Sequence, residues 1–328
     1  MVSVLPEQNN KRNTVMIGIL LNILFLALGF VMLAKGSDWF VDGAAGIATK
    51  FKIPQLVIGL TIVAIGTSSP EAAVSITAAF AGNADITIGN IVGSNILNIL
   101  IILGLASVIV PISVGKSILK IDLPFTIGIT LLLLLLGYNG KITRIEGIIL
   151  LVVFIGYLVY LLISSKKNKP EETEIKDLSI PKAIIFTVLG LGIVILGSHF
   201  TVETATNLAE KIGIPDSFIG LTIVALGTSL PELFTSVTAA RKGNADIAIG
   251  NIVGSNIFNI LLVVGLSALV IPVPFEAKFI VDIIIAAAAT VLLLVLSIKG
   301  KLKRFAGIIM LCGYAAYFVK LLIPIIQK

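Results

Sequence analysis

The hydrophobic positions of this chain fall into ten long runs that are separated by short polar segments. About 20 apolar residues are needed for a helix to cross the hydrocarbon core of a bilayer, and the runs approach or exceed that length. The runs cover residues 15–35, 53–80, 86–110, 119–138 and 146–163, and then 182–198, 214–240, 247–271, 279–298 and 305–326. The pattern predicts an all-α membrane protein with ten transmembrane helices.

Two regions of the chain carry nearly the same sequence. GLTIVAIGTSSPE at residues 59–71 matches GLTIVALGTSLPE at 220–232 in 11 of 13 positions. GNADITIGNIVGSNILNI at 82–99 matches GNADIAIGNIVGSNIFNI at 243–260 in 16 of 18 positions. Both pairs are offset by 161 positions, so the chain is a tandem duplication. The Gly-Thr-Ser and Pro-Glu interruption within each long run predicts that helices 2 and 7 are discontinuous.

The duplication predicts an inverted repeat. Each half contains five runs, and because five is odd, the second half enters the membrane from the opposite side to the first. Inverted five-helix repeats with broken helices are typical of secondary transporters. The predicted layout is a polar tail at 1–14, a first repeat at 15–163, a charged linker at 164–181, and a second repeat at 182–328.

The basic residues predict the orientation of the chain. If both termini lie outside, the inward-facing loops and their flanks hold 16 of the 24 Lys and Arg residues, including those of the central linker. Cytoplasmic loops carry an excess of Lys and Arg. The linker is therefore predicted to be cytoplasmic, with the N- and C-termini outside a multi-pass cell-membrane protein.

Composition narrows the class of function. Hydrophobic residues make up 57% of the chain and charged residues 13%, whereas a soluble domain has about 25% charged residues. The net charge of +6 comes from loop residues that are not interleaved with aromatics, which argues against nucleic-acid binding. A single cysteine excludes an internal disulfide, and no enzyme or cofactor motif is present. We expect no enzyme activity, no cofactor and no obligate protein partner.

Two carboxylates stand out from the 18 in the chain because they lie well inside long apolar runs. Glu71 and Glu232 are these residues. A charged side chain at such depth costs about 2.5–3.5 kcal/mol on insertion scales, and such residues normally face a cavity or a partner. The alternative is a glutamate without a functional role that is neutral or paired with a base. The deepest base, Lys320, lies near the end of the last run, too far from the middle of the membrane for such a pair. We therefore interpret both glutamates as functional.

Each glutamate follows a proline that interrupts its helix. Pro70 and Pro231 lack an N–H group and disrupt the hydrogen bond to the carbonyl four residues earlier, at Gly66 and Gly227. Irregular backbone at membrane depth is tolerated where protein or water surrounds it. The result is a set of oxygen ligands suited to hard cations such as Ca²⁺ and Na⁺. A single such motif is also typical of a kinked packing helix, but its duplication favours a site.

A second motif in each half adds hydroxyl and amide groups. Ser94 with Asn98, and Ser255 with Asn259, are each four residues apart and so share one helical face. The alternative is that these groups only join helices. Asn90, Asn95, Asn251 and Asn256 lie on other faces and are predicted to cap or pack. Glycines four apart predict close helix contacts at Gly89, Gly93, Gly250 and Gly254.

GTSxPE followed by GNxxGSNxxN, in two copies, resembles the two alpha repeats of the sodium/calcium exchanger family, in the cation/Ca²⁺ exchanger superfamily. The resemblance covers about 60 residues closely, and the ten-run layout agrees over the rest; the chain is similar to prokaryotic-type members without a large regulatory loop. It implies that Glu71 and Glu232 bind Ca²⁺ with the carbonyls of Thr67 and Thr228. It also implies Na⁺ sites that use the two glutamates and Ser68, Ser229, Ser94, Ser255, Asn98, Asn259, Ala64 and Ala225.

One position departs from the family pattern. Family members often have an aspartate where this chain has Asn259. The neutral amide leaves two formal carboxylates at the centre rather than three. It should also remove one group able to help bind K⁺ or a proton.

The charge count predicts a mechanism. Two carboxylates carry −2, which one Ca²⁺ neutralises, and several Na⁺ ions sharing them would compete with Ca²⁺. Crossing with an empty, charged site is disfavoured, so we expect an Na⁺/Ca²⁺ antiporter that works by alternating access and is electrogenic. An exchanger driven by H⁺, or linked to K⁺, is the nearest alternative, and a cation channel is a more distant one.

Overall fold

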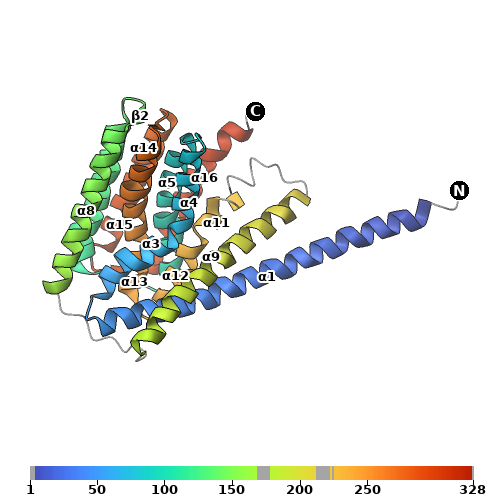
Figure 1. Ribbon diagram of the computed structural model, residues 1–328, viewed down its shortest axis with the longest axis horizontal. Coiled ribbons are helices and arrows are strands. Elements are labelled where there is room, and N and C mark those ends of the chain that lie inside the picture. The colour runs from blue at the N-terminus through green and yellow to red at the C-terminus, as the bar shows by residue number, and fades with distance from the viewer. Residues whose placement is uncertain (1–3, 168–177, 212–221, 224, 327–328) are drawn as a thin grey trace.

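The computed structural model describes residues 4–167, 178–211, 222–223 and 225–326. Nearly all of this part of the chain is helical, in agreement with the predicted fold class. Figure 1 shows a bundle of helices from which two long helices, α1 and α9, extend obliquely to one side. Short loops connect most elements, as the spacing of the apolar runs predicts.

The first half begins with the long helix α1 and ends with α8. Its elements, with π-helical segments marked η, are α1 (Val4–Lys50), α2 (Gln55–Ile58), η1 (Gly59–Val63), α3 (Ala64–Thr67), α4 (Ser69–Phe80), α5 (Asp85–Leu97), η2 (Asn98–Leu103), α6 (Gly104–Ile109), β1 (Ile112–Ser113), η3 (Ile118–Asp122), α7 (Leu123–Gly137), β2 (Lys141–Ile142) and α8 (Arg144–Lys167).

The second half repeats this order. Its described elements are α9 (Ile180–Lys211), α11 (Ala225–Thr228), α12 (Leu230–Arg241), α13 (Ala245–Phe258), η5 (Asn259–Val263), α14 (Val264–Val270), β3 (Val273–Pro274), α15 (Lys278–Ser297), β4 (Lys301–Leu302) and α16 (Arg304–Ile326). The predicted seventh run, 214–240, lies partly outside the described residues. Its later part, α11 and α12, is described.

Helices α1 and α9 pack tightly along their lengths, and small residues make this approach possible. A Cβ built on Gly36 would lie 3.0 Å from the carbonyl oxygen of Gly190, and one on Gly190 would lie 2.8 Å from that of Gly36. Gly29 and Gly197 make the same reciprocal contact at 3.2 and 3.1 Å. Backbones this close have no room for larger side chains.

Both helices are longer than the sequence predicts. The apolar runs at 15–35 and 182–198 form parts of helices of 47 and 32 residues. The polar positions that appear to end each run are buried against other helices: Ser37 is fully buried, and Thr201 and Thr204 are almost so. Tertiary packing therefore continues both helices beyond the apolar pattern.

The predicted break in the second run is present. The helix that ends at Thr67 and the helix that begins at Ser69 are bent by 50°. Ser68 and Ser229 occupy equivalent positions between two helices, with similar backbone angles of φ −83°, ψ 7° and φ −92°, ψ 7°. Helices 2 and 7 are thus both discontinuous, as predicted.

Four two-residue strands, which the sequence does not predict, join loops of the two halves. β1 pairs antiparallel with β4, and β2 pairs antiparallel with β3. By the repeat offset, β1 is the counterpart of β3 and β2 is the counterpart of β4, so each pair links a loop of one half to the non-equivalent loop of the other. Strands this short carry no periodic signal, so only their partner across the molecule defines them.

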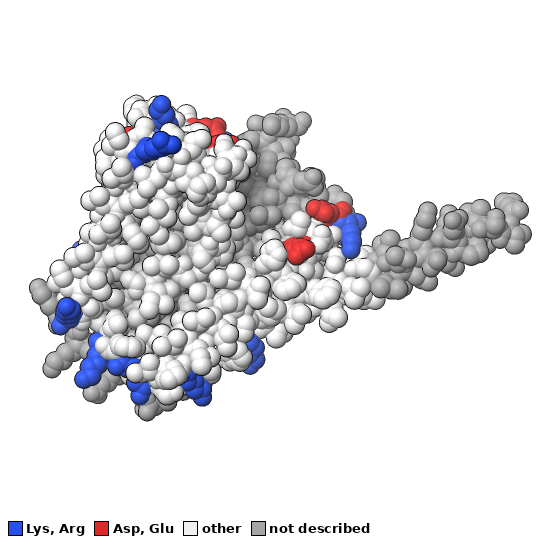
Figure 2. Space-filling model, in the orientation of Figure 1, with Lys and Arg blue, Asp and Glu red and all other residues white. Residues whose placement is uncertain are grey.

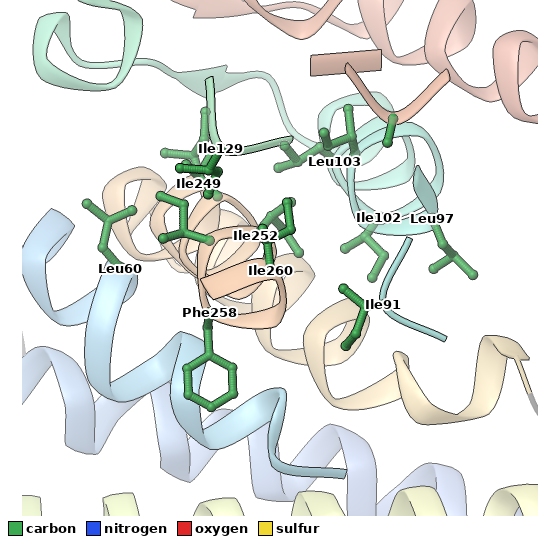
Figure 3. Packing of buried hydrophobic residues seen from close by; sticks show 14 of the residues in the cluster. Leu60, Ile91, Leu97, Ile102, Leu103, Ile129, Ile249, Ile252, Phe258 and Ile260 are labelled. Carbon is green, nitrogen blue, oxygen red and sulfur yellow. The ribbon is translucent and has the colours of Figure 1, made fainter. Parts of the chain in front are cut away.

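Helices α5 and α13, with the segments that follow them, form the buried centre of the molecule. Figure 3 shows Leu60 of η1 and Ile129 of α7 clustered with Ile249 and Ile252 of α13. All four side chains are at most 4% exposed. This central position is expected of the helices that carry the second polar motif.

The outer surface is largely apolar. In the space-filling view of Figure 2, a broad uncharged band separates the charged side chains near the two ends of the bundle. Eight helices of the described residues are long and apolar enough to cross a membrane, and the bent pair at Gln55–Phe80 raises this to nine. The protein is a multi-pass membrane protein.

Candidate functional site

The two buried glutamates begin equivalent helices at the centre of the molecule. Glu71 lies in the first turn of α4 and Glu232 in the first turn of α12, and each is 1% exposed. The preceding Pro70 and Pro231 occupy the start of a helix, where a missing N–H group carries no penalty. An acidic side chain in this position also interacts favourably with the helix dipole.

Each glutamate accepts a hydrogen bond from the other half of the chain. The Ser68 hydroxyl donates to Oε1 of Glu232 at 2.8 Å, and the Ser229 hydroxyl donates to Oε1 of Glu71 at 3.2 Å. The serine of each helix break therefore binds the glutamate that follows the other break. The two halves build one site, as the duplicated motif predicts.

Asparagines of α5 and α13 position the glutamate backbone. The Asn90 amide donates to the carbonyl oxygen of Glu71 at 3.3 Å and to the hydroxyl of Ser75 at 2.9 Å. In the second half, the amide of Asn251 donates to the Glu232 carbonyl at 3.5 Å and to the Ser236 hydroxyl at 2.9 Å. These four contacts attach α5 to α4 and α13 to α12.

Asn251 also connects the halves. Its side-chain oxygen accepts a hydrogen bond of 2.9 Å from the hydroxyl of Thr67, in the broken helix of the first half. The Thr67 side chain is completely buried. This bond holds the residue whose carbonyl is predicted to bind Ca²⁺.

A reciprocal asparagine network joins α5 to α13. The amides of Asn95 and Asn256 donate to each other's backbone carbonyls at 3.2 and 3.1 Å. The amide of Asn98 donates to the side-chain oxygen of Asn256 at 3.0 Å, and the Asn259 amide donates to that of Asn95 at 3.1 Å. All four side chains are at most 3% exposed. The network confirms a packing role for Asn95 and Asn256.

Four buried oxygens in this region accept no hydrogen bond from the described residues: Oε2 of Glu71, Oε2 of Glu232, Oδ1 of Asn98 and Oδ1 of Asn259. A buried polar atom without a partner costs about 1–3 kcal/mol, so such atoms call for a physical explanation. Carboxylate and amide oxygens are ligands for hard cations. The donor set therefore suits Ca²⁺ or Na⁺ as a transported substrate.

The backbone carbonyls near the breaks have mixed roles. The carbonyl of Gly66 accepts a 2.7 Å hydrogen bond from Ser69, and that of Gly227 accepts one of 2.7 Å from Ser198. The hydroxyls thus replace the helical partner that each proline removes. The Ala64 carbonyl accepts a hydrogen bond from the backbone N–H of Ser68 at 3.0 Å and longer bonds from the hydroxyls of Thr67 at 3.4 Å and Ser255 at 3.5 Å.

The remaining predicted residues lie on the same elements. Ser94 is 5% exposed in α5 and Ser255 is completely buried in α13. Asn98 and Asn259 begin the π-helical segments η2 and η5, a feature that is frequent at functional sites. Ala225 and Thr228 form the two ends of α11.

The glycine faces of the two central helices differ. A Cβ on Gly254 would meet the Leu60 carbonyl at 2.7 Å, and one on Gly250 would meet the Gly59 Cα at 3.1 Å. This confirms the predicted close contact in α13. A Cβ on Gly93, the counterpart of Gly254, would meet nothing within 4 Å among the described residues, so the prediction is wrong there.

The face of α5 at Gly93 borders a cavity of about 460 Å³, whereas a Cβ on Gly89 would lie 3.3 Å from the Phe279 ring. Gly89, Asn90, Gly93 and Ser94 line one side of it, and residues of α15 and α16 line the other. The cavity thus reaches a predicted Na⁺ ligand, Ser94, and the residue that holds the Glu71 backbone. The matching face of α13 is filled by the packed segment α2–η1–α3.

Sequence reasoning missed the positioning role of Asn90 and Asn251, which it treated as capping or packing residues. It also did not single out their partners Ser75 and Ser236. A signal was available, because each serine follows its glutamate by four residues and so lies on the same helical face.

Comparisons with known proteins identify the family. The family described as "Sodium/calcium exchanger protein" matches this chain at residues 21–163 and 182–322. The chain belongs to the sodium/calcium exchanger family. The two matched segments correspond closely to the two halves of this exchanger.

Similar proteins cover nearly the whole exchanger. It is 40% identical to the putative antiporter CaxA of Alkalimonas amylolytica over 90% of this chain and 96% of CaxA. It is 35% identical to the sodium/calcium exchanger MaX1 of Methanosarcina acetivorans, over 92% and 99% of the two chains. A solved structure of the sodium-calcium exchanger NCX_Mj superposes with a TM-score of 0.81 at 34% identity, covering 92% of this chain and 98% of that one.

Membership of this family defines the general activity of the protein. The similar proteins named above are exchangers and antiporters rather than enzymes. This exchanger is a cation/Ca²⁺ antiporter, and Na⁺ and Ca²⁺ are the ions of its family.

Proposed function

We propose that the protein exchanges Na⁺ for Ca²⁺ through one central site shared by the two halves. The observation that carries this proposal is that Glu71, Glu232, Asn98 and Asn259 each have a buried oxygen that accepts no hydrogen bond from the described residues. They come in repeat-related pairs, and each pair contributes one kind of ligand. The similarity to MaX1 and NCX_Mj, which are named as sodium/calcium exchangers, supports Na⁺ as the driving ion.

The ligands divide between the two ions in this proposal. Glu71 and Glu232, with the carbonyls of Thr67 and Thr228, bind Ca²⁺. Na⁺ ions use the same carboxylates and the hydroxyl, amide and carbonyl oxygens of Ser68, Ser229, Ser94, Ser255, Asn98, Asn259, Ala64 and Ala225. The serine bonds to Oε1 of each glutamate support this assignment because those hydroxyls already lie at the carboxylates.

The charge of the site supports coupling. Two carboxylates balance one Ca²⁺, and Asn259 adds no third negative charge. Because an unneutralised pair of carboxylates is costly in a buried site, the empty carrier is disfavoured and each ion must be exchanged for the other. Transport is electrogenic if more than two Na⁺ ions move for each Ca²⁺.

The contrast between the two glycine faces supports alternating access. The cavity beside Gly93 is the proposed access route to Ser94 on one side of the membrane. The packed contact of Gly254 with Leu60 is the proposed closed route on the other side. In the opposite state, the face of α13 opens and the face of α5 closes.

The domain layout supports the same proposal. We infer a first repeat at 15–163 and an inverted second repeat at 182–328, preceded by a polar tail and joined by a cytoplasmic linker at 164–181, with both termini outside. The reciprocal contacts between Gly36 and Gly190, and between Asn95 and Asn256, support a twofold relation between the halves.

A gradient-swap assay tests the driving ion. Purified protein in liposomes is loaded with Na⁺, K⁺ or H⁺, diluted into medium without that ion, and supplied with radioactive Ca²⁺. We expect uptake above the chemical gradient of Ca²⁺ with an outward Na⁺ gradient alone. Uptake that follows only the H⁺ gradient would show that H⁺ rather than Na⁺ drives exchange. Uptake that requires K⁺ would show that K⁺ takes part. Uptake that never exceeds equilibrium would indicate a channel.

Electrogenicity is tested in the same vesicles. Clamping the membrane potential with K⁺ and valinomycin should change the initial rate of Na⁺-driven Ca²⁺ uptake. A rate that is unchanged by potentials of either sign would show that two Na⁺ ions, and no more, move per Ca²⁺.

A further inference from the structure

A second pair of carboxyl groups is related by the duplication but lies outside the central site. β2 and β4, and α8 and α16, begin 160 positions apart. With this offset, Asp122 at the start of the α7 span corresponds to Asp282 in α15. On the neighbouring helices, Tyr157 of α8 corresponds to Tyr317 of α16, and Tyr160 corresponds to Lys320.

In the second half the aspartate has a cationic partner. Nζ of Lys320 lies 2.5 Å from Oδ1 of Asp282, and the two side chains are partly exposed. The same Nζ lies 5.6 Å from the centre of the Tyr317 ring. The charge of Asp282 is therefore balanced within the protein.

In the first half, the described residues offer the aspartate only neutral partners. Asp122 is completely buried; the Tyr157 hydroxyl donates to its Oδ1 at 3.0 Å, and that of Ser117 donates to its Oδ2 at 3.4 Å. Tyr157 is itself 5% exposed and stacks on Phe125 at 4.7 Å. Tyr160 occupies the sequence position at which the second half has its lysine.

No Lys, Arg or His within the described ranges forms an ion pair with Asp122. The ionisable groups that lie near it are Tyr157 and, behind it, Tyr160, with ring centres 6.1 Å apart. Lys116 and Lys120 on the same segment are exposed to solvent. Asp246 lies close to Gly115, in the loop that precedes this segment.

This environment favours a neutral carboxyl group. An isolated charge in an apolar interior is so unfavourable that the group normally takes up a proton instead. Two hydroxyl donors offset only part of the lost hydration, and the second of them is long. A protonated Asp122 has a suitable acceptor, because Ser117 Oγ can accept its proton in a hydrogen bond.

We propose that Asp122 is a proton-binding site whose occupancy controls the rate of exchange. Ser117 is half-buried and lies between Lys116, which is exposed, and Asp122, which is buried. The Ser117 hydroxyl is therefore the route by which the proton passes between water and Asp122. In this step the Asp122 carboxyl group becomes a carboxylate and releases its proton to water, so no other co-reactant is needed.

Helix packing links this site to transport. Asp122 ends the π-helical turn η3, which continues directly into α7, and α7 packs on α13 through Ile129 beside Ile249 (Figure 3). α13 carries Ser255 and leads to Asn259. An unbalanced charge at Asp122 must draw water or a cation into this end of α7. This changes how α7 packs against α13.

The inference rests on cation/Ca²⁺ exchange but not on the identity of the driving ion, so its test uses exchange of Ca²⁺ for radioactive Ca²⁺. Rates are measured in liposomes at a series of pH values, equal on both sides. Asp122→Asn keeps the shape and cannot ionise. Because Glu71 and Glu232 are present in both proteins and must be ionised to bind Ca²⁺, the rate of the unaltered protein is divided by that of Asp122→Asn at each pH. We expect this ratio to fall about fivefold or more as rising pH ionises Asp122, which is the lower end of typical coupling between two sites.

Two further variants sharpen the test. Asp282→Asn is the matched control and should keep the fall. Tyr160→Lys supplies the partner that Lys320 provides in the second half, so the charge of Asp122 should be balanced at every pH and the fall should disappear. A pH profile of Asp122→Asn that superposes on that of the unaltered protein, or a Tyr160→Lys profile that does so, overturns the proposal.

Infrared spectroscopy gives a readout that does not depend on transport. The carbonyl stretch of a protonated carboxylic acid should be lost on raising the pH of the unaltered protein, and should lack one component in Asp122→Asn. Identical spectra of the two proteins overturn the proposal. A failure of Na⁺ to drive Ca²⁺ uptake would instead affect only the proposed driving ion.

Discussion

The hydroxyl of Ser68 lies 2.8 Å from Oε1 of Glu232, although the two residues belong to different halves of the chain. Ser229 makes the equivalent bond to Glu71. Each helix break therefore supplies one carboxylate and, through its serine, holds the carboxylate of the other break. A change in either half must alter the site as a whole.

Removing either central carboxylate should abolish Ca²⁺ exchange. Glu71→Gln and Glu232→Gln keep the size of the side chain but remove its charge. Outer partners of a metal site contribute about 10–100-fold in affinity, so we expect loss of a direct ligand to lower Ca²⁺ uptake by more than about 100-fold. The measurement is radioactive Ca²⁺ uptake in liposomes.

Glu203→Gln is the control for this prediction, because Glu203 is a glutamate with an exposed side chain in α9. It should transport Ca²⁺ as the unaltered protein does. Normal uptake by Glu71→Gln would remove that residue from the proposed Ca²⁺ site.

The asparagines that hold the glutamate backbone should differ in importance. Asn251→Ala removes contacts to the Glu232 carbonyl, Ser236 and Thr67, whereas Asn90→Ala removes contacts only to the Glu71 carbonyl and Ser75. Both variants should weaken Ca²⁺ binding, within the 10–100-fold range of outer partners, with the larger loss for Asn251→Ala. Isothermal titration with Ca²⁺ measures the affinity directly. Equal affinities in the two variants would show that the bond to Thr67 contributes nothing.

Restoring an acid at Asn259 should change which ions support exchange. Asn259→Asp converts an oxygen without a donor into part of a third carboxylate, so the empty site carries −3 rather than −2. One Ca²⁺ no longer balances the site, and an additional monovalent cation or proton should be needed. We expect Ca²⁺ uptake by this variant to depend on K⁺ or on pH. The gradient-swap assay measures this, and Asn259→Ala, which adds no charge, is the control.

The two glycine faces should respond differently to a single methyl group. Gly254→Ala places a Cβ 2.7 Å from the Leu60 carbonyl and 2.8 Å from the Cβ of Ala64, whereas Gly93→Ala adds one facing the cavity. Overpacking typically costs about 1–3 kcal/mol, so Gly254→Ala should lower the melting temperature in detergent while Gly93→Ala leaves it nearly unchanged. Equal melting temperatures would contradict the closed packing of α13.

Local features of the site could be predicted from the sequence because the duplication made them visible. The paired GTSxPE motifs located both helix breaks, and depth within an apolar run singled out Glu71 and Glu232. The ends of α1 and α9 could not be predicted in this way. Residues such as Ser37 and Thr201 look like the end of a transmembrane run, but they are buried against neighbouring helices.

The sequence by itself determined that this is a duplicated helical membrane protein with acidic, interrupted helices, because apolar length, proline position and repeat spacing are local properties of the chain. Only the tertiary structure decided which groups meet. It placed Ser68 against Glu232, and Asn251 rather than a neighbouring asparagine against Thr67. It also placed Gly93 beside a cavity and Gly254 against backbone, although the two glycines have the same sequence context. The motif copies are almost identical, so no local signal distinguishes them. The difference arises from what packs against each copy, which is a property of the whole fold.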